Sequence, residues 1–409
     1  MRRGAFIAGS AASAGALAAG RAVSAAPVPA AAVTLGNDVF LHETWRELRD
    51  RCVGIVTNQA GVTGQLESVV DAVRRNPQIC LRALYAPEHG LRGERPAGSY
   101  VASYTDERSG LPVYSLYGAT RHPSEPMLAG IDVILIDLQD VGARAYTYAS
   151  TMVYVMQTAK ALGKDVWVLD RPNPIGGDIV EGPVLDPKYA SFIGLYPIAM
   201  RHGLTIGELA RLCNDRFGIG CALRVVPMRG YRRDMLWPDT GLAWVQTSPN
   251  IPDWRSALLY PATGLIDEAG VNNGSNTTKP FAFAGAAHVD GERLADVLNA
   301  RPIPGVYFRP AAWSPLAGFW AGKTLTGVEL VIVDERAFRA VRTAVELLVA
   351  VRRVAPGVIA VHADGLDRDW GTDVLRHGLE DGLAVDDILA RWEAGTREFQ
   401  ASRARYFLY

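Results

Sequence analysis

Residues 131–140 read IDVILIDLQD, an apolar run that ends in a cluster of polar side chains. Three other runs have the same form, at residues 52–56, 79–85 and 166–169. Apolar runs of this length that alternate with helical segments are typical of buried parallel strands. The pattern predicts an α/β fold built around a doubly wound parallel sheet.

Polar residues follow each of these predicted strands. They include Asn58, Glu88, His89, Asp140, Arg171 and Asn173. In an open parallel sheet the binding crevice lies at the carboxyl ends of the strands. We therefore expect these side chains to gather at one edge and to line one site, which suits an enzyme acting on a polar small molecule or a sugar.

Glu88 is the leading catalytic candidate. It follows a proline at the end of a predicted buried strand. A partly desolvated carboxyl group there has the character of a general acid, and His89 is placed to orient it or to bind substrate. The alternative is a loop glutamate that caps a helix or pairs with Arg92.

Asp140 and Glu181 are the candidates for a second carboxylate. Glycoside hydrolysis commonly needs one carboxyl group to protonate the leaving oxygen and another to stabilise or attack the anomeric centre. Asp140 follows the third predicted strand, and Glu181 lies in a Gly/Pro-rich segment. The alternative for Asp140 is an ion pair that holds Arg144 in place.

Further binding candidates lie between and after the strands. Arg144 and Tyr146 enter a predicted helix, where arginine suits carboxylates and an aromatic ring suits a sugar face. Arg201 and His202 precede a helix that opens with a capping box at Thr205, and a helix N-terminus attracts anions. The alternative for the tyrosine is a place in the core.

Composition narrows the class of protein. The 409 residues are 49% hydrophobic with a net charge of −1, so a full core is expected and a polyanion partner is not. No dinucleotide fingerprint, Walker loop, serine elbow or His-Glu-x-x-His motif occurs, and we expect neither cofactor nor metal. The composition changes after residues 249–252, where the chain becomes rich in Gly, Asn, Trp and Pro. This change predicts two domains, residues 33–259 and a smaller domain of residues 260–409 that covers the cleft.

The cysteines show no metal-binding spacing. Cys52 and Cys80 fall in predicted buried strands, and Cys213 and Cys221 are close enough in sequence to pair. We expect four buried or unpaired thiols, with a Cys213–Cys221 disulfide as the alternative.

The first residues have the form of an export signal. Arg2 and Arg3 precede an apolar, small-residue stretch at residues 4–20, and residues 23–25 offer a small-residue cleavage site. The paired arginines predict the twin-arginine route over residues 1–25, with an ordinary secretory signal as the alternative. We expect a secreted, periplasmic or envelope protein with no transmembrane segment after processing.

Several motifs taken together resemble one known family, the exo-β-N-acetylmuramidases of bacterial cell-wall recycling. They are residues 54–61, 86–93, 138–148, 169–174, 181–183, 200–203, 249–252 and 405–409. The likeness covers nearly all of the chain after residue 33. It implies a Rossmann-like domain, a smaller second domain and a cleft between them.

The resemblance also implies an activity and further site residues. The activity is hydrolysis of terminal β-linked N-acetylmuramic acid from the non-reducing ends of peptidoglycan fragments, with Glu88 at the position of the family's strand-end glutamate. The lactyl carboxylate of the sugar needs a cation, and Arg144, Arg171 and Arg201 are the candidates. Asn250 and Glu268 are added as substrate-binding residues on the same basis.

One loop departs from the family pattern. Residues 269–281 contain no arginine where the family usually has one, and only Lys279 offers a positive charge. The departure raises two alternatives, a glycosidase of the same family with altered sugar specificity and a non-catalytic muropeptide- or sugar-binding protein. An esterase or amidase ranks last, because no Ser-His-Asp arrangement is recognisable.

Overall fold

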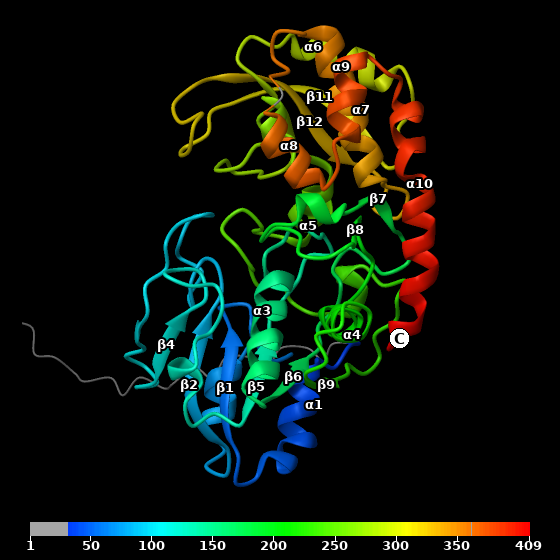
Figure 1. The fold of residues 1–409 in the computed structure, drawn as a ribbon. Helices are drawn as coiled ribbons and strands as arrows, with labels where there is room; N and C mark the ends of the chain where they lie inside the picture. Colours follow the sequence, from blue (N-terminus) through cyan, green and yellow to red (C-terminus); the bar gives the residue numbers. More distant parts are fainter. Residues whose placement is uncertain (1–31, 361) are drawn as a thin grey trace, which may run out of the picture.

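A seven-stranded sheet forms the first part of the molecule (Figure 1). The structure is a computed structural model that describes residues 32–360 and 362–409, so the predicted export signal at 1–25 lies outside the described residues. In spatial order the sheet contains β3 (Tyr104–Thr105), β4 (Pro112–Ser115), β2 (Cys80–Ala86), β1 (Cys52–Thr57), β5 (Val133–Asp137), β6 (Asp165–Leu169) and β9 (Ala222–Val226).

Strand β1 lies near the middle of this sheet and pairs in parallel with β2 and β5. The pairs β2–β4, β5–β6 and β6–β9 are also parallel, and the short β3 runs antiparallel to β4. Val56 pairs with Tyr85 and Thr57 pairs with Asp137, so the carboxyl ends of three central strands are level. The predicted α/β fold is confirmed.

Helices cover both faces of the sheet because alternate strand residues point in opposite directions. The four helices are α1 (Gly36–His42), α2 (Val69–Arg74), α3 (Tyr148–Ala161) and α4 (Ile206–Arg216). On one face Val133 and Leu135 pack with α1 and α2. On the other face Ile134 and Ile136 pack with α3 and α4. Near-continuous apolar strands are what a sheet buried on both faces requires.

The second part is built on an antiparallel sheet in the order β10 (Phe283–Ala286), β12 (Leu325–Ile332), β11 (Val306–Trp313). Its helices are α5 (Trp254–Thr263), α6 (Gly291–Asn299), α7 (Ala340–Val354), α8 (Ala363–Trp370), α9 (Val374–Asp381) and α10 (Val385–Ser402). The Gly/Pro-rich segment before α4 forms a hairpin of β7 (Glu181–Val184) and β8 (Ala199–Arg201). In the described residues no helix is long and apolar enough to cross a bilayer.

Short 3-10 turns complete the described structure. They are η1 (Thr44–Leu48), η2 (Pro126–Leu128), η3 (Pro187–Tyr189), η4 (Trp237–Thr240), η5 (Asp267–Ala269) and η6 (Arg403–Tyr406). The first of them follows directly after α1.

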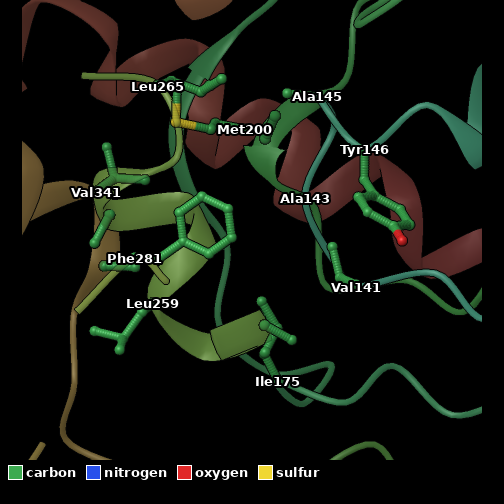
Figure 2. Close-up of a cluster of buried hydrophobic side chains, with 14 of the residues drawn as sticks. Val141, Ala143, Ala145, Tyr146, Ile175, Met200, Leu259, Leu265, Phe281 and Val341 are labelled. Atoms are coloured by element: carbon green, nitrogen blue, oxygen red, sulfur yellow. The ribbon is translucent and has the colours of Figure 1, made fainter. Parts of the chain in front are cut away.

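Apolar packing is continuous across residues 259 and 260, where the sequence predicts a domain boundary. One buried cluster contains Tyr146 and Met200 from the first part together with Leu265, Phe281 and Val341 from the second (Figure 2). The two parts therefore share a core. The division into 33–259 and 260–409 stays a prediction.

Helix α10 runs from the second part back to the first (Figure 1), and the turn η6 after it packs against α4. The Tyr409 hydroxyl donates to Asp170 Oδ2 at 2.9 Å, and the Leu408 N–H donates to Glu208 Oε1 at 2.9 Å. Burial and the nearby negative charge of Glu208 raise the pKa of Asp170 to about 7. The end of α10 thus supplies donors that these buried carboxyl groups need.

Cys52 and Cys80 form a disulfide, with their Cα atoms 4.5 Å apart. They face each other at the amino ends of β1 and β2. The expectation of four unpaired thiols is wrong for this pair, because parallel strand pairing brings together residues that are 28 positions apart. Cys213 and Cys221, the pair considered from spacing, are free and buried.

Replacing both Cys52 and Cys80 by serine should lower the free energy of unfolding by about 3 kcal/mol, because the disulfide closes a loop in the unfolded chain. Urea unfolding with and without a reductant measures the effect. Reduction should destabilise the wild type and leave the double variant unchanged. A double variant as stable as the oxidised wild type would contradict the assignment.

Candidate active site

Glu88 stands two residues beyond the end of β2, where the chain turns at His89 with a φ of 73°. Its side chain is buried, with 7% of the residue exposed. Oε1 accepts a hydrogen bond from the Gly98 N–H at 2.8 Å, and Oε2 accepts one from the Thr147 hydroxyl at 2.7 Å. Two neutral donors from different segments therefore hold the carboxylate in one orientation.

A cavity of about 190 Å³ adjoins Glu88. Among the described residues its wall contains no lysine, no arginine and no second carboxylate. Hydroxyl, amide and ring groups dominate it, and they come from both parts of the molecule. The lining residues include Glu88, His89, Tyr117, Tyr146, Asn250 and Tyr260.

The tautomer of His89 follows from its hydrogen bond. Nδ1 lies 2.8 Å from the carbonyl oxygen of Arg95. A carbonyl oxygen only accepts, so Nδ1 carries the proton and Nε2 of the neutral ring is an acceptor. The bond to Arg95 fixes the orientation of the His89 ring in the cavity wall.

A hydrogen-bonded chain supports the wall behind Tyr146. The Tyr146 hydroxyl donates to Thr247 Oγ1 at 3.1 Å, and the Tyr148 hydroxyl donates to the Thr247 carbonyl at 2.7 Å. Asn58 Nδ2 donates to the Tyr148 hydroxyl at 2.6 Å. Asn58 therefore reaches the site through other residues and does not line the cavity.

The tyrosines of the cavity stay protonated over the ordinary pH range. Burial, with the negative charge of Glu88 as the next cause, raises the pKa of Tyr117 and of Tyr260. Burial also raises the pKa of Tyr146 well above its usual value. Neutral phenol groups beside one carboxylate make a wall that suits the hydroxyls and ring faces of a sugar.

The three arginines considered as substrate cations are buried and already have partners within the protein. Arg144 donates to three backbone carbonyl oxygens, and burial lowers its pKa to about 10. Arg171 pairs with Asp137 at 2.5 Å, and Arg201 pairs with Glu181 at 2.9 Å. None of the three arginines lines the Glu88 cavity. The structure therefore gives them supporting roles.

The candidate second carboxylates also lie outside the cavity. Asp140 Oδ2 accepts from the Gly142 N–H at 2.7 Å and lies 3.5 Å from His202 Nε2. Glu181, besides its arginine, accepts from the Ala340 N–H at 3.1 Å. The predicted pairing of Glu88 with either carboxylate in one cavity is not what the structure shows, because both serve buried backbone and side-chain donors.

Asn250 lines the cavity, and its Oδ1 accepts from the Asn276 N–H at 3.0 Å. Asn173 and Glu268 do not line it. Asn173 donates to the Leu204 carbonyl at 3.1 Å and accepts from the Ile175 N–H at 3.1 Å. Glu268 lies half-buried in η5.

The loop that departs from the family pattern contributes Phe281 to the cavity wall. Lys279, the one cation in that loop, is 2.5 Å from Glu329 on β12 and does not line the cavity. It therefore does not replace the missing arginine at the site.

Sequence reasoning missed several residues of the site. Thr147 lies within a motif that was recognised, but its bond to Glu88 crosses 59 positions of the chain. Ser248 and Tyr260 belong to a region without a clear strand or helix pattern. No group of three or more His, Cys, Asp or Glu side chains suited to a metal ion occurs in residues 32–360 and 362–409.

A Rossmann-like sheet with one carboxylate in a small polar-aromatic cavity is the arrangement of an α/β protein that acts on a sugar. Comparison with known proteins narrows this class. Residues 53–255 match the family model described as exo-β-N-acetylmuramidase NamZ, N-terminal, and residues 258–409 match its C-terminal counterpart. The chain therefore belongs to the NamZ exo-β-N-acetylmuramidase family.

Individual relatives agree with this assignment. The chain is 43% identical over 378 residues to the peptidoglycan β-N-acetylmuramidase NamZ of Bacillus subtilis (strain 168), covering 92% of this chain and 91% of that protein. A crystal structure of a DUF1343 family protein from Bacteroides fragilis matches with a TM-score of 0.87 at 36% identity, covering 93% and 100% of the two chains. A second crystal structure of a DUF1343 family protein from the same organism matches with a TM-score of 0.76 at 28% identity, covering 92% of this chain and 99% of that chain.

Arg171→Ala should destabilise the protein by about 3–5 kcal/mol, because it leaves Asp137 buried without its countercharge. Urea unfolding measures the loss. Arg46→Ala is the control, since Arg46 is exposed and stacks on Trp45 far from this pair in sequence. An Arg171→Ala protein of wild-type stability would show that the arginine is free for another role.

Proposed function

We propose that this protein is an exo-acting glycoside hydrolase that releases terminal β-linked N-acetylmuramic acid from the non-reducing ends of peptidoglycan fragments. The observation that carries the proposal is the lone carboxylate of Glu88 in a cavity of aromatic, hydroxyl and amide groups. Membership of the NamZ family and 43% identity to a peptidoglycan β-N-acetylmuramidase support the same reaction and substrate class.

The size of the cavity supports removal of one sugar at a time. At about 190 Å³ it is smaller than the roughly 300–1,000 Å³ of sites that enclose drug-sized ligands. A space of this size accommodates a single sugar residue and not a run of them. This suits an enzyme that trims terminal residues.

Glu88 is the proposed general acid. Protonated, it donates its proton to the glycosidic oxygen as the bond from that oxygen to C1 breaks, and the leaving sugar departs as a neutral alcohol. The Gly98 N–H and the Thr147 hydroxyl hold the carboxyl group during the transfer. Both partners are neutral, so no ion pair holds the group away from the substrate.

The lack of a second carboxylate in the cavity wall favours help from the substrate. The oxygen of the 2-acetamido group attacks C1 as the glycosidic bond breaks, which gives an oxazolinium ring. Water then adds to C1 and passes a proton to Glu88, and the acetamido group is restored. Tyr146 and Asn250 are the proposed groups that orient the acetamido side chain.

We also propose that the protein works outside the cytoplasm, after export by the twin-arginine route. The paired arginines at residues 2–3 support this route. A Cys52–Cys80 disulfide supports an oxidising compartment, because such bonds persist mainly in exported proteins.

Glu88→Gln should lower turnover of para-nitrophenyl β-N-acetylmuramic acid by about 10²–10⁴-fold, because glutamine has no proton to give. Glu94→Gln is the matched control, since Glu94 is an exposed glutamate of the same loop. Both variants should keep the wild-type circular dichroism spectrum. Near-normal activity of Glu88→Gln would remove this residue from the mechanism. Tight binding of intact disaccharide by the wild type without cleavage would favour the binding-protein alternative.

If the acetamido group attacks C1, two inversions occur and the sugar is released as the β-anomer. Proton NMR in the first minutes of the reaction, before mutarotation, reports the anomer formed. The α-anomer as first product would overturn the substrate-assisted route while leaving the hydrolase assignment intact.

A further inference from the structure

The proposed substrate carries a negative charge that the cavity wall does not balance. N-acetylmuramic acid differs from N-acetylglucosamine by a lactyl ether that ends in a carboxylate. Among the described residues the wall of the Glu88 cavity contains neither lysine nor arginine. A cation that binds this carboxylate must therefore lie at the mouth of the cavity.

Most cations near the mouth are already paired. Arg92 pairs with Asp106 at 2.7 Å, and Arg95 lies 3.5 Å from Glu94. Lys279 of the opposite loop is held by Glu329. A cation shared with a fixed protein carboxylate is poorly placed to bind a second one.

Arg121 is different. It is exposed, and within the part of the chain that the structure describes its guanidinium has no carboxylate partner. Its Cζ atom lies 5.0 Å from the ring centre of Tyr117, which lines the cavity, and 4.3 Å from the ring centre of Phe192. Phe192 immediately precedes Ile193, another lining residue. Arg121 is thus placed at the Tyr117–Ile193 side of the mouth.

The rings beneath Arg121 form a rigid base. The Tyr117 and Phe192 rings are 5.7 Å apart, and Phe192 packs against Tyr154 at 5.6 Å. His122, next to Arg121, stacks on Tyr154 at 3.7 Å. A guanidinium has five N–H donors, so one seated over aromatic rings still has donors with which to bind a carboxylate in two parallel hydrogen bonds.

We propose that Arg121 binds the lactyl carboxylate of N-acetylmuramic acid and so sets the preference of this enzyme for muramic acid over N-acetylglucosamine. The assignment rests on the proposed function. It gives this chain a substrate cation from the segment after β4, in place of the arginine that its loop at residues 269–281 lacks.

The test compares wild type with Arg121→Ala and Arg121→Lys on three chromogenic β-glycosides: N-acetylmuramic acid, its lactyl methyl ester and N-acetylglucosamine. The wild type should prefer the free acid. Arg121→Ala should lose about 10- to 100-fold in kcat/KM on the free acid, mainly through KM, because a charge-assisted hydrogen bond is lost. Its activity on the two uncharged substrates should not fall, and Arg121→Lys should restore part of the preference.

Arg46→Ala is the matched control, because Arg46 is also an exposed arginine stacked on an aromatic ring, 5.0 Å from the centre of Trp45. It should retain the wild-type preference. An Arg121→Ala enzyme that still prefers the free acid, or that loses activity equally on all three glycosides, would overturn the assignment.

Failure of the proposed function has a separate outcome, a wild type that cleaves none of the three. In that case calorimetric binding of free N-acetylmuramic acid and N-acetylglucosamine still tests Arg121. Weaker binding of the acid alone by Arg121→Ala would uphold the cation site, and equal binding by wild type and variant would reject it.

Discussion

Parallel pairing of β2, β1, β5 and β6 is the constraint on which the rest of the structure depends. It brings the strand ends to one level, so several buried polar groups meet at a single edge. Each must be satisfied, because an unpaired buried charge costs several kcal/mol. Arg171 forms an ion pair with Asp137, and the Thr205 hydroxyl and the Gly207 N–H donate hydrogen bonds to Asp170. Most polar residues of the edge therefore serve the fold.

Glu88 differs from the other buried charged groups at this edge, because it lines a cavity. Its partners are a backbone N–H and a threonine hydroxyl, and no cation pairs with it among the described residues. The two donors come from the loop after β2 and from the residue before α3, so the carboxyl group is held at the cavity without a countercharge. Tyr260 and Phe281 line the cavity from the second part, so the proposed general acid lies where the two parts share their core.

The strands, the α/β class and the burial of Glu88 beyond a strand end could be predicted because apolar runs and strand-end clusters are local patterns. The roles of Arg144, Arg171 and Arg201 could not, since a sequence does not say which polar groups satisfy one another. The disulfide was also not predicted, because it depends on the register of β1 with β2. Tyr260 escaped because α5 contains Pro261, which argues against a helix there.

The contacts of Leu408 and Tyr409 have a consequence for how the chain matures. Glu208 and Asp170 are buried in the first part, yet donors that complete their surroundings come from the last residues of the sequence. A growing chain lacks these donors until long after β9, the last strand of the large sheet, has been made. The two buried carboxyl groups therefore gain these hydrogen bonds only late in synthesis.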